Sequence, residues 1–118
     1  IKCDESQINR VLNNLIINSI HSIESKYNNE SGGTIYIDAS LKDNYLKIKI
    51  FDNGKGLSHK EEDLLKPYFS TKEKNIGTGL GLSIVEKIIS EHGGNFHIYN
   101  LEDKSGVCSE FTLRLFND

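Results

Sequence analysis

The sequence has 118 residues, which is enough for one domain and too short for two of ordinary size. Apolar residues make up 36% and charged residues 26%, a composition that excludes a disordered segment and supports a folded core. With 14 basic and 17 acidic residues the formal net charge is −3, which argues against a nucleic-acid partner.

A first helix is predicted from a capping box, with Asp4 as the N-cap and Gln7 three residues later. It should extend to about Ser25. The residues of its core face recur at helical spacing: Ile8, Val11, Leu12, Leu15, Ser19 and Ile23.

Two strands are predicted next, at 34–40 and 45–52, because apolar and polar residues alternate there. Lys42-Asp43-Asn44 fits the hairpin turn between them. Residues 54–77 contain the only proline and read as a long loop with one short helix. Loops of this length inside a domain are usually functional.

A second helix is predicted at 80–92, with Gly93 as the residue that ends it, followed by strands at 96–101 and 109–116. The order is helix, hairpin, long loop, helix, hairpin. It predicts an α+β fold, a two-layer sandwich whose mixed, mostly antiparallel sheet has helices on one face.

The chain contains no methionine and starts at Ile1, so we expect residues 1–118 to be one domain of a longer protein. No apolar run approaches the roughly 18 residues of a membrane span. No signal peptide is recognisable. We expect a cytoplasmic domain without membrane contact, in a parent protein that could be membrane-anchored.

Cys3 and Cys108 are far apart and read as thiols in a reducing compartment.

Asn14 and Asn18 lie four residues apart and so on one face of the first helix. Asparagine is a poor helix former, so a pair among Leu and Ile residues requires an explanation. Either the pair belongs to a solvated face, or its amide oxygens are offered to a hard cation such as Mg²⁺. Spacing alone leaves both interpretations open.

Asp52 shares its side of the second strand with apolar residues, where a carboxylate is costly unless it is hydrogen-bonded. Gly54 and Gly56 follow, as if a ligand came close to the backbone. Asp-Asn-Gly is also a good turn by itself. We favour the functional interpretation, in which Asp52 accepts a hydrogen bond from a ligand amino group such as that of adenine.

The segment Gly77-Thr78-Gly79-Leu80-Gly81-Leu82 precedes the second helix. Free N–H groups and the helix dipole make such a start an anion site, and the alternative is a flexible hinge. We favour the phosphate site, because three alternating glycines at a helix start are costly to keep for a hinge alone. The spacing fits neither the Rossmann fingerprint nor a P-loop. Lys72 could reach a terminal phosphate as a point charge, or could be an ordinary solvated lysine.

Four segments in this order resemble the boxes of the ATP-binding catalytic domain of sensor histidine kinases. That domain belongs to the superfamily of gyrase, Hsp90, histidine kinase and MutL. The segments are Asn14–Ser19 (N box), Asp52–Leu57 (G1 box), Lys66–Lys72 (F box) and Gly77–Leu82 (G2 box). The Pro-Tyr-Phe-Ser-Thr-Lys form of the third resembles the nitrogen-regulation subgroup, NtrB or NtrY.

The resemblance implies a Bergerat-type ATP-binding fold and assigns a role to each matching residue. Asn18 is similar to the Mg²⁺ ligand, with Asn14 beside the phosphates. Asp52 resembles the aspartate that binds the adenine amino group, and Gly54 and Gly56 would let the purine approach. The remaining positions implied to contact ATP are Lys72, Gly77, Thr78, Gly79, Leu80, Gly81, Leu82 and Ser109.

The resemblance further implies an ATP lid at about 57–76. Three positions depart from the family near the first helix. His21 and Ser22 stand where relatives often carry a basic residue and an aromatic one, and Ser19 replaces an alanine. The contacts of that turn with phosphate are therefore in question.

Superfamily members that hydrolyse ATP carry a glutamate as general base where this chain has Asn14, which cannot accept a proton from water. We therefore expect a protein-histidine kinase domain that uses Mg-ATP. It would donate the γ-phosphate to a histidine on a dimerisation domain of the same protein, for relay to a response regulator aspartate. The alternatives are a regulatory pseudo-kinase module, an ATPase or a serine kinase of the same superfamily.

Overall fold

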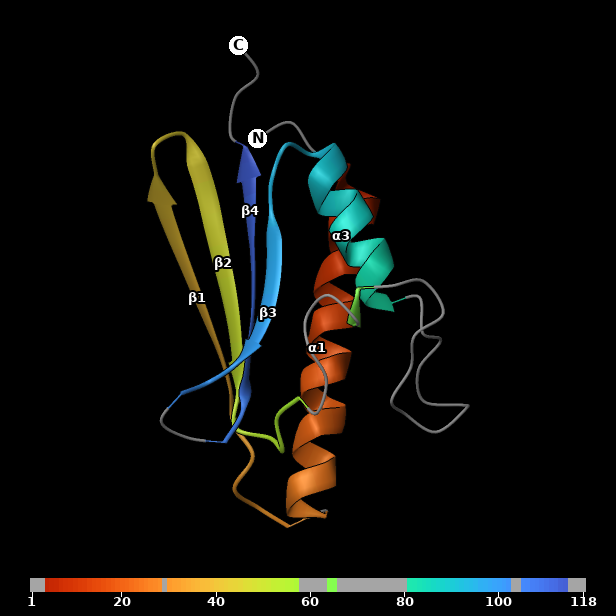
Figure 1. The fold of residues 1–118 in the computed structure, drawn as a ribbon, viewed down its shortest axis with the longest axis vertical. Coiled ribbons are helices and arrows are strands. Elements are labelled where there is room, and N and C mark those ends of the chain that lie inside the picture. Colours follow the sequence, from red (N-terminus) through yellow and green to blue (C-terminus); the bar gives the residue numbers. More distant parts are fainter. Residues whose placement is uncertain (1–3, 29, 58–63, 66–80, 103–104, 115–118) are drawn as a thin grey trace.

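The computed structural model describes residues 4–28, 30–57, 64–65, 81–102 and 105–114. Within them lie helices α1 (Glu5–Tyr27) and α3 (Gly81–Glu91), and strands β1 (Ile35–Lys42), β2 (Tyr45–Asp52), β3 (Phe96–Asn100) and β4 (Val107–Arg114). The described strands form one sheet in the order β1-β2-β4-β3, and each neighbouring pair is antiparallel. Both helices lie on one side of this sheet (Figure 1). The predicted two-layer α+β architecture is confirmed.

Helix α1 begins where the capping box predicts, because the Asp4 side chain accepts hydrogen bonds from the backbone N–H groups of Ser6 and Gln7. The reciprocal half of the predicted box is wrong. The backbone N–H of Asp4 donates to His92 Nε2 over 3.0 Å. The helix continues two residues beyond Ser25 and ends at Tyr27.

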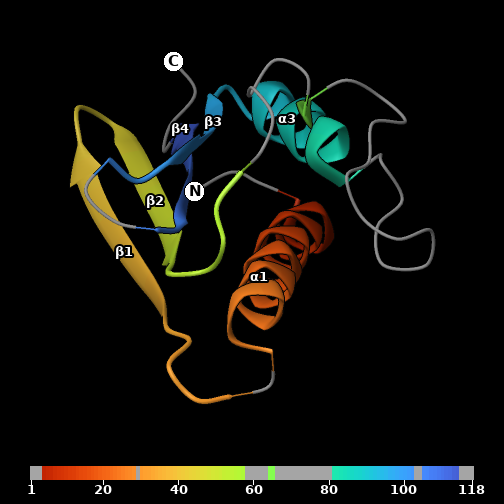
Figure 2. The same ribbon diagram turned by 60° about the horizontal axis from the view of Figure 1, so that its bottom comes forward.

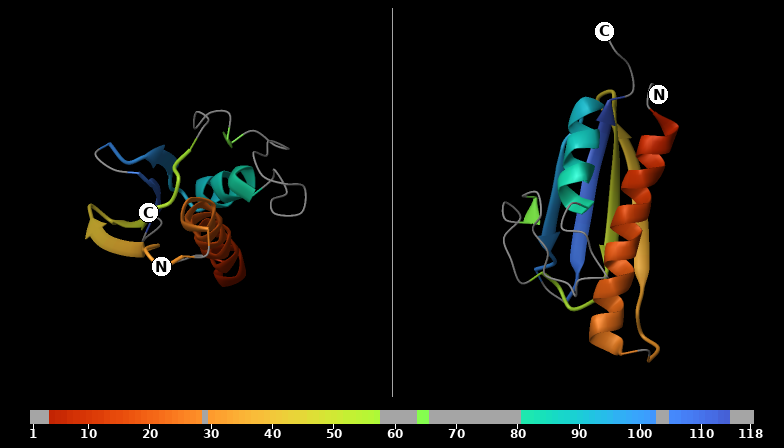
Figure 3. Two further views of the ribbon diagram at one scale, coloured as in Figure 1. Left: turned by 90° about the horizontal axis from the view of Figure 1, so that it is seen from below. Right: turned by 90° about the vertical axis from the view of Figure 1, so that its right-hand side faces the viewer.

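His92 lies just after α3 and joins the ends of the two helices. Its Nδ1 lies 2.7 Å from the carbonyl oxygen of Ile88, so Nδ1 carries the proton while Nε2 accepts from Asp4. A histidine at the C-terminal end of a helix also interacts favourably with the helix dipole. The structure adds a direct tie between α3 and the start of α1, which run antiparallel to each other (Figure 3).

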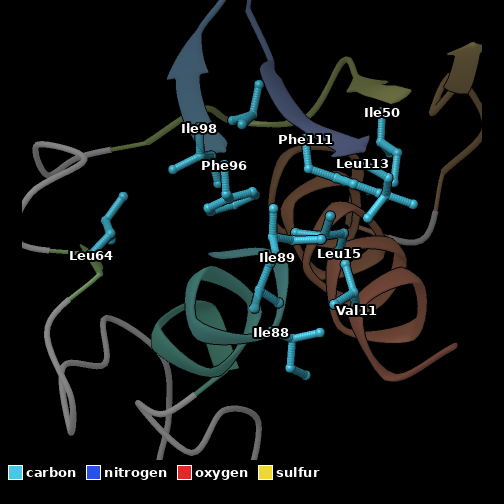
Figure 4. Close-up of a cluster of buried hydrophobic side chains, with 12 residues drawn as sticks. Val11, Leu15, Ile50, Leu64, Ile88, Ile89, Phe96, Ile98, Phe111 and Leu113 are labelled. Atoms are coloured by element: carbon cyan, nitrogen blue, oxygen red, sulfur yellow. The ribbon is translucent and has the colours of Figure 1, made fainter. Parts of the chain in front are cut away.

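The core lies between the helices and the middle of the sheet (Figure 4). Spacing of three and four residues places Val11 and Leu15 of α1 on the inner face, and both are fully buried. The same periodicity buries one side of α3. The other described side chains in this buried cluster are Ile50, Leu64, Val85, Ile88, Ile89, Phe96, Ile98, Val107, Phe111 and Leu113.

The β1–β2 hairpin turns at Asp43 and Asn44, whose φ angles are +52° and +70°. Two consecutive positive φ angles are typical of the type I′ turn that matches strand twist. The apolar side of β1 remains open, and Ile37 and Leu41 are 52% and 70% exposed. Their partners on β2 are covered because α1 packs over β2 and leaves the edge strand beyond its reach. The predicted alternation in β1 is therefore correct, but it does not produce a buried face.

In the second half of the chain, the observed helix and strands also lie close to their predicted positions. Gly93, with φ of +76°, ends α3 as predicted. Strand β4 begins at Val107, two residues before its predicted start, and the predicted 115–116 lie outside the described residues. Most of the long loop 54–77 lies outside them as well. None of the helices in the described ranges is long and apolar enough to cross a membrane.

Candidate functional site

Asp52 is the last residue of β2 and points into the space between the sheet and α1. Alternation along the strand gives it the same side as Ile50, which is fully buried, and Asp52 itself is only 4% exposed. Its Oδ1 accepts a hydrogen bond from the backbone N–H of Gly54 over 2.9 Å. The predicted carboxylate on the apolar face is therefore present.

Burial raises the pKa of the Asp52 carboxyl above its ordinary value, because the charged form loses water. The Gly54 N–H acts in the opposite direction on this pKa, as do the hydroxyls of Ser19 and Ser22. The carboxylate is thus a buried hydrogen-bond acceptor surrounded by donors. A ligand amino group that donates to it would benefit from the low local dielectric.

The loop 53–57 follows β2 on the side of the sheet that faces α1 (Figure 2). Hydrogen bonds hold it to other parts of the chain. The side chain of Asn53 accepts from Thr34 N (2.7 Å) and donates to Gly32 O (2.8 Å). The Lys55 N–H donates to Ser22 O of α1 over 3.2 Å. The hydroxyl of Ser105 donates to the Gly54 carbonyl. These hydrogen bonds fix the path of the loop from Asn53 to Lys55.

The fold itself requires glycine at both Gly54 and Gly56, for reasons that the sequence did not indicate. A Cβ at Gly54 would overlap the backbone and hydroxyl of Ser22, so α1 can pack there only against a glycine. Gly56 has a φ of +90°, which side chains rarely adopt. Room for a purine stays a prediction for both positions.

The two predicted asparagines lie on α1 one turn apart, and both are half-buried. Asn18 precedes Ser19, which is 2% exposed and whose hydroxyl lies close enough to Asp52 to lower the pKa of that carboxyl. The amide of Asn18 is thus carried by the same turn of helix that adjoins the buried carboxylate. Asn14 is carried by the preceding turn.

The first turn of α3 contains Gly81 and Leu82, the last two residues of the predicted phosphate segment. Figure 1 shows that α3 starts beside the middle of α1, and the two helices are in contact. A Cβ at Gly81 would meet no other atom within 4 Å, so packing among the described residues does not require glycine there. The other predicted phosphate positions lie outside the described residues, as does most of the predicted lid: Lys72, Gly77, Thr78, Gly79 and Leu80.

Ser109 of β4 is 3% exposed and pairs with Ile50 on one side and Ile98 on the other. It lies two residues from Val107, the partner of Asp52 in the sheet. The structure therefore brings this predicted residue into the same buried end of the sheet as the carboxylate.

Two residues near Asp52 were not predicted as site residues. Ser19 was predicted only as a core-face residue that departs from the family pattern, and Ser22 only as such a departure. The hydroxyl of Ser19 lies beside Asp52, and the hydroxyl of Ser22 is buried against Gly54 without a hydrogen-bond partner among the described residues. A signal for Ser19 was available, because a serine on an otherwise apolar helical face requires a polar partner. Ser22 gave no such signal.

A metal held by side chains alone is not supported by the described residues, where no group of three or more His, Cys, Asp or Glu could hold an ion. Mg²⁺ commonly takes one or two protein oxygens and completes its shell with water and substrate phosphates. The amide oxygen of Asn18 fits a site of that kind.

Residues 3–117 match the family described as Histidine kinase-, DNA gyrase B-, and HSP90-like ATPase. The chain belongs to this family. Within it, the domain is the one found in sensor histidine kinases. The catalytic domain of histidine kinase ThkA aligns over 97% of the chain and 70% of its own, with a TM-score of 0.78 and 32% identity. The mycobacterial sensor histidine kinase MprB, at 22% identity and TM-score 0.78, shares the fold.

Sensor histidine kinase ZraS of Escherichia coli K12 is 37% identical over 116 residues, which are 98% of this chain and 23% of ZraS. Nitrogen regulation protein NtrY of Azorhizobium caulinodans is 37% identical over 113 residues, or 94% of the chain and 14% of NtrY. The chain therefore spans less than a quarter of the length of these relatives. The resemblance to the NtrY subgroup is confirmed and extends equally to ZraS.

Proposed function

We propose that this domain binds Mg-ATP and donates the γ-phosphate to a histidine on a dimerisation domain of its parent protein, for relay to a response regulator. The single observation that carries the proposal is the buried Asp52 carboxylate beside a hydrogen-bonded loop, next to the helix turn that bears Asn18. Membership of the histidine kinase-like family supports the same conclusion.

The roles of the residues follow from their chemistry. Asp52 would accept a hydrogen bond from the adenine amino group, which supplies base recognition. Asn18 would offer its amide oxygen to Mg²⁺, which neutralises phosphate charge during transfer. The N–H groups at the start of α3, from Gly81 and Leu82, would face phosphate oxygens. Phosphoryl transfer requires mainly positioning and charge neutralisation, and these groups supply both.

Asn14 favours transfer over hydrolysis in this proposal. An amide cannot take a proton from an attacking water, so the site has no general base at the position where hydrolysing relatives carry one. The nucleophile would instead be a histidine on the dimerisation domain.

The Asn18→Ala variant tests the proposed metal contact. We expect wild-type protein to bind ATP more tightly with Mg²⁺ than with EDTA, and the variant to lose most of this difference, because alanine offers no oxygen to the ion. The loss should be about tenfold or more in Kd, measured by titration calorimetry under both conditions. Asn13→Ala, an exposed neighbour on the same helix, is the control. An equal Mg²⁺ effect in wild type and Asn18→Ala would remove Asn18 from the metal site.

A further inference from the structure

Asn100, the last residue of β3, holds the backbone of Leu57 with both ends of its side-chain amide. Its Oδ1 accepts from the Leu57 N–H over 2.7 Å, and its Nδ2 donates to the Leu57 carbonyl over 3.2 Å. This pair of hydrogen bonds satisfies the donor and the acceptor of one residue, as a neighbouring strand would. The side chain of Asn100 therefore binds the backbone of Leu57 at the edge of the sheet as the backbone of a paired strand would.

The position of Asn100 in the sheet explains what these two hydrogen bonds do. Asn100 pairs with Val107, and Val107 pairs with Asp52, so the three residues form one row at the end of β3, β4 and β2. The chain leaves that row at Asp52 and is bound at Leu57 by the residue at the far end of the same row. The loop 53–57 therefore crosses the end of β4 and is fixed on both sides.

The Asn100 side chain packs directly against Gly56. A Cβ at Gly56 would lie 3.0 Å from Asn100 Oδ1, and the φ of +90° already disfavours a side chain there. The glycine therefore leaves room for the amide as well as for the turn. Without Asn100 the loop would keep its contacts at Asn53, Gly54 and Lys55 but would lose its anchor at Leu57.

We infer that Asn100 is a positioning residue for base recognition, which holds Gly56 and Leu57 so that the loop beside Asp52 stays shaped for the purine. The inference rests on the proposed function. It places Asn100 on the base side of the nucleotide and away from the phosphates, which the start of α3 would bind. Loss of the anchor should therefore weaken ATP binding and leave the binding of an inorganic polyphosphate unaffected.

The Asn100→Ala variant tests this inference in calorimetric titrations with Mg-ATP and with Mg-tripolyphosphate. We expect the Kd for ATP to rise about tenfold, the effect of removing one or two hydrogen bonds that order a loop, while the Kd for tripolyphosphate stays within about twofold. Asn100→Asp keeps an acceptor for the Leu57 N–H but places a carboxylate oxygen against the Leu57 carbonyl in place of the donor, so its Kd for ATP should rise as well.

Asn95→Ala is the matched control, because Asn95 precedes the same strand and uses its backbone N–H to bind Thr112 Oγ1. Its affinity for ATP should equal that of the wild type. Unchanged ATP binding by Asn100→Ala, or an equal loss for ATP and tripolyphosphate, would overturn the inference while leaving the proposed function intact. Failure of the wild type to bind ATP would overturn both.

Discussion

Asp52→Asn should weaken ATP binding and stabilise the fold at the same time. An asparagine offers one side-chain acceptor oxygen, whereas the Gly54 N–H already uses one oxygen of Asp52 and the adenine amino group needs another. With ATP bound, the variant would turn its NH2 group, itself a donor, toward one of these two donors. The expected loss is about 1–3 kcal/mol of binding free energy, or about 5- to 150-fold in Kd, measured by calorimetry.

The gain in stability follows from the raised pKa of Asp52. A carboxyl whose pKa is higher in the fold than in the unfolded chain contributes stability below the unfolded pKa, near 4, and loses it as the pH rises through the folded pKa. At pH 7 the ionised, buried carboxylate therefore lowers the free energy of unfolding. The amide introduced by Asp52→Asn carries no charge to bury.

Urea unfolding as a function of pH measures this second effect. Asp52→Asn should have the higher unfolding free energy at pH 7, and its advantage should shrink as the solution is acidified and Asp52 in the wild type takes up a proton. The exposed Asp38 on β1 provides the control variant Asp38→Asn, which should change neither quantity. If the Asp52→Asn variant bound ATP as tightly as the wild type, Asp52 would not contact the nucleotide.

Gly94→Ala should strongly destabilise the fold. Gly94 connects α3 to β3, and a Cβ there would overlap the carbonyl oxygen of Thr112 in β4. That oxygen belongs to a backbone held by the hydrogen bond from Thr112 N to Asn95 O (3.0 Å), so it has little freedom to move. We expect a loss of about 3 kcal/mol of unfolding free energy, the upper part of the usual range for overpacking.

Gly81→Ala is the matched comparison for stability. A Cβ at Gly81 meets no atom of the described residues within 4 Å, and alanine is the better helix former by up to about 1 kcal/mol. Denaturant midpoints of the two variants should therefore move in opposite directions from the wild type. A Gly94→Ala protein as stable as the wild type would show that the α3–β3 junction is looser than its contacts indicate.

The sequence predicted the elements well because their signals are local. The helix cap at Asp4, the two-residue turn at Asp43 and Asn44, and the glycine after α3 each depend on a few neighbouring residues. Contacts between distant residues gave no such signal. The bond from Asp4 N to His92 joins residues 88 positions apart, and the pattern around Asp4 predicted a partner within the same helix.

The candidate site shows the same limit. Asp52 was predictable because a carboxylate among alternating apolar residues is anomalous by itself. Ser22 and Asn100 were not, because a serine near a helix end and an asparagine at a strand end are ordinary residues in sequence. Their importance comes from packing that only the fold creates, with Ser22 against Gly54 and Asn100 on Leu57.

Transfer of labelled γ-phosphate from ATP to a separately supplied dimerisation domain of the same protein is the most direct measurement of the proposed activity. We predict label on the histidine of that domain when this domain and Mg²⁺ are both present, and none on this domain alone. Steady release of phosphate by this domain alone, abolished by Asn14→Ala and without label on the acceptor, would contradict the proposed kinase and indicate a hydrolase.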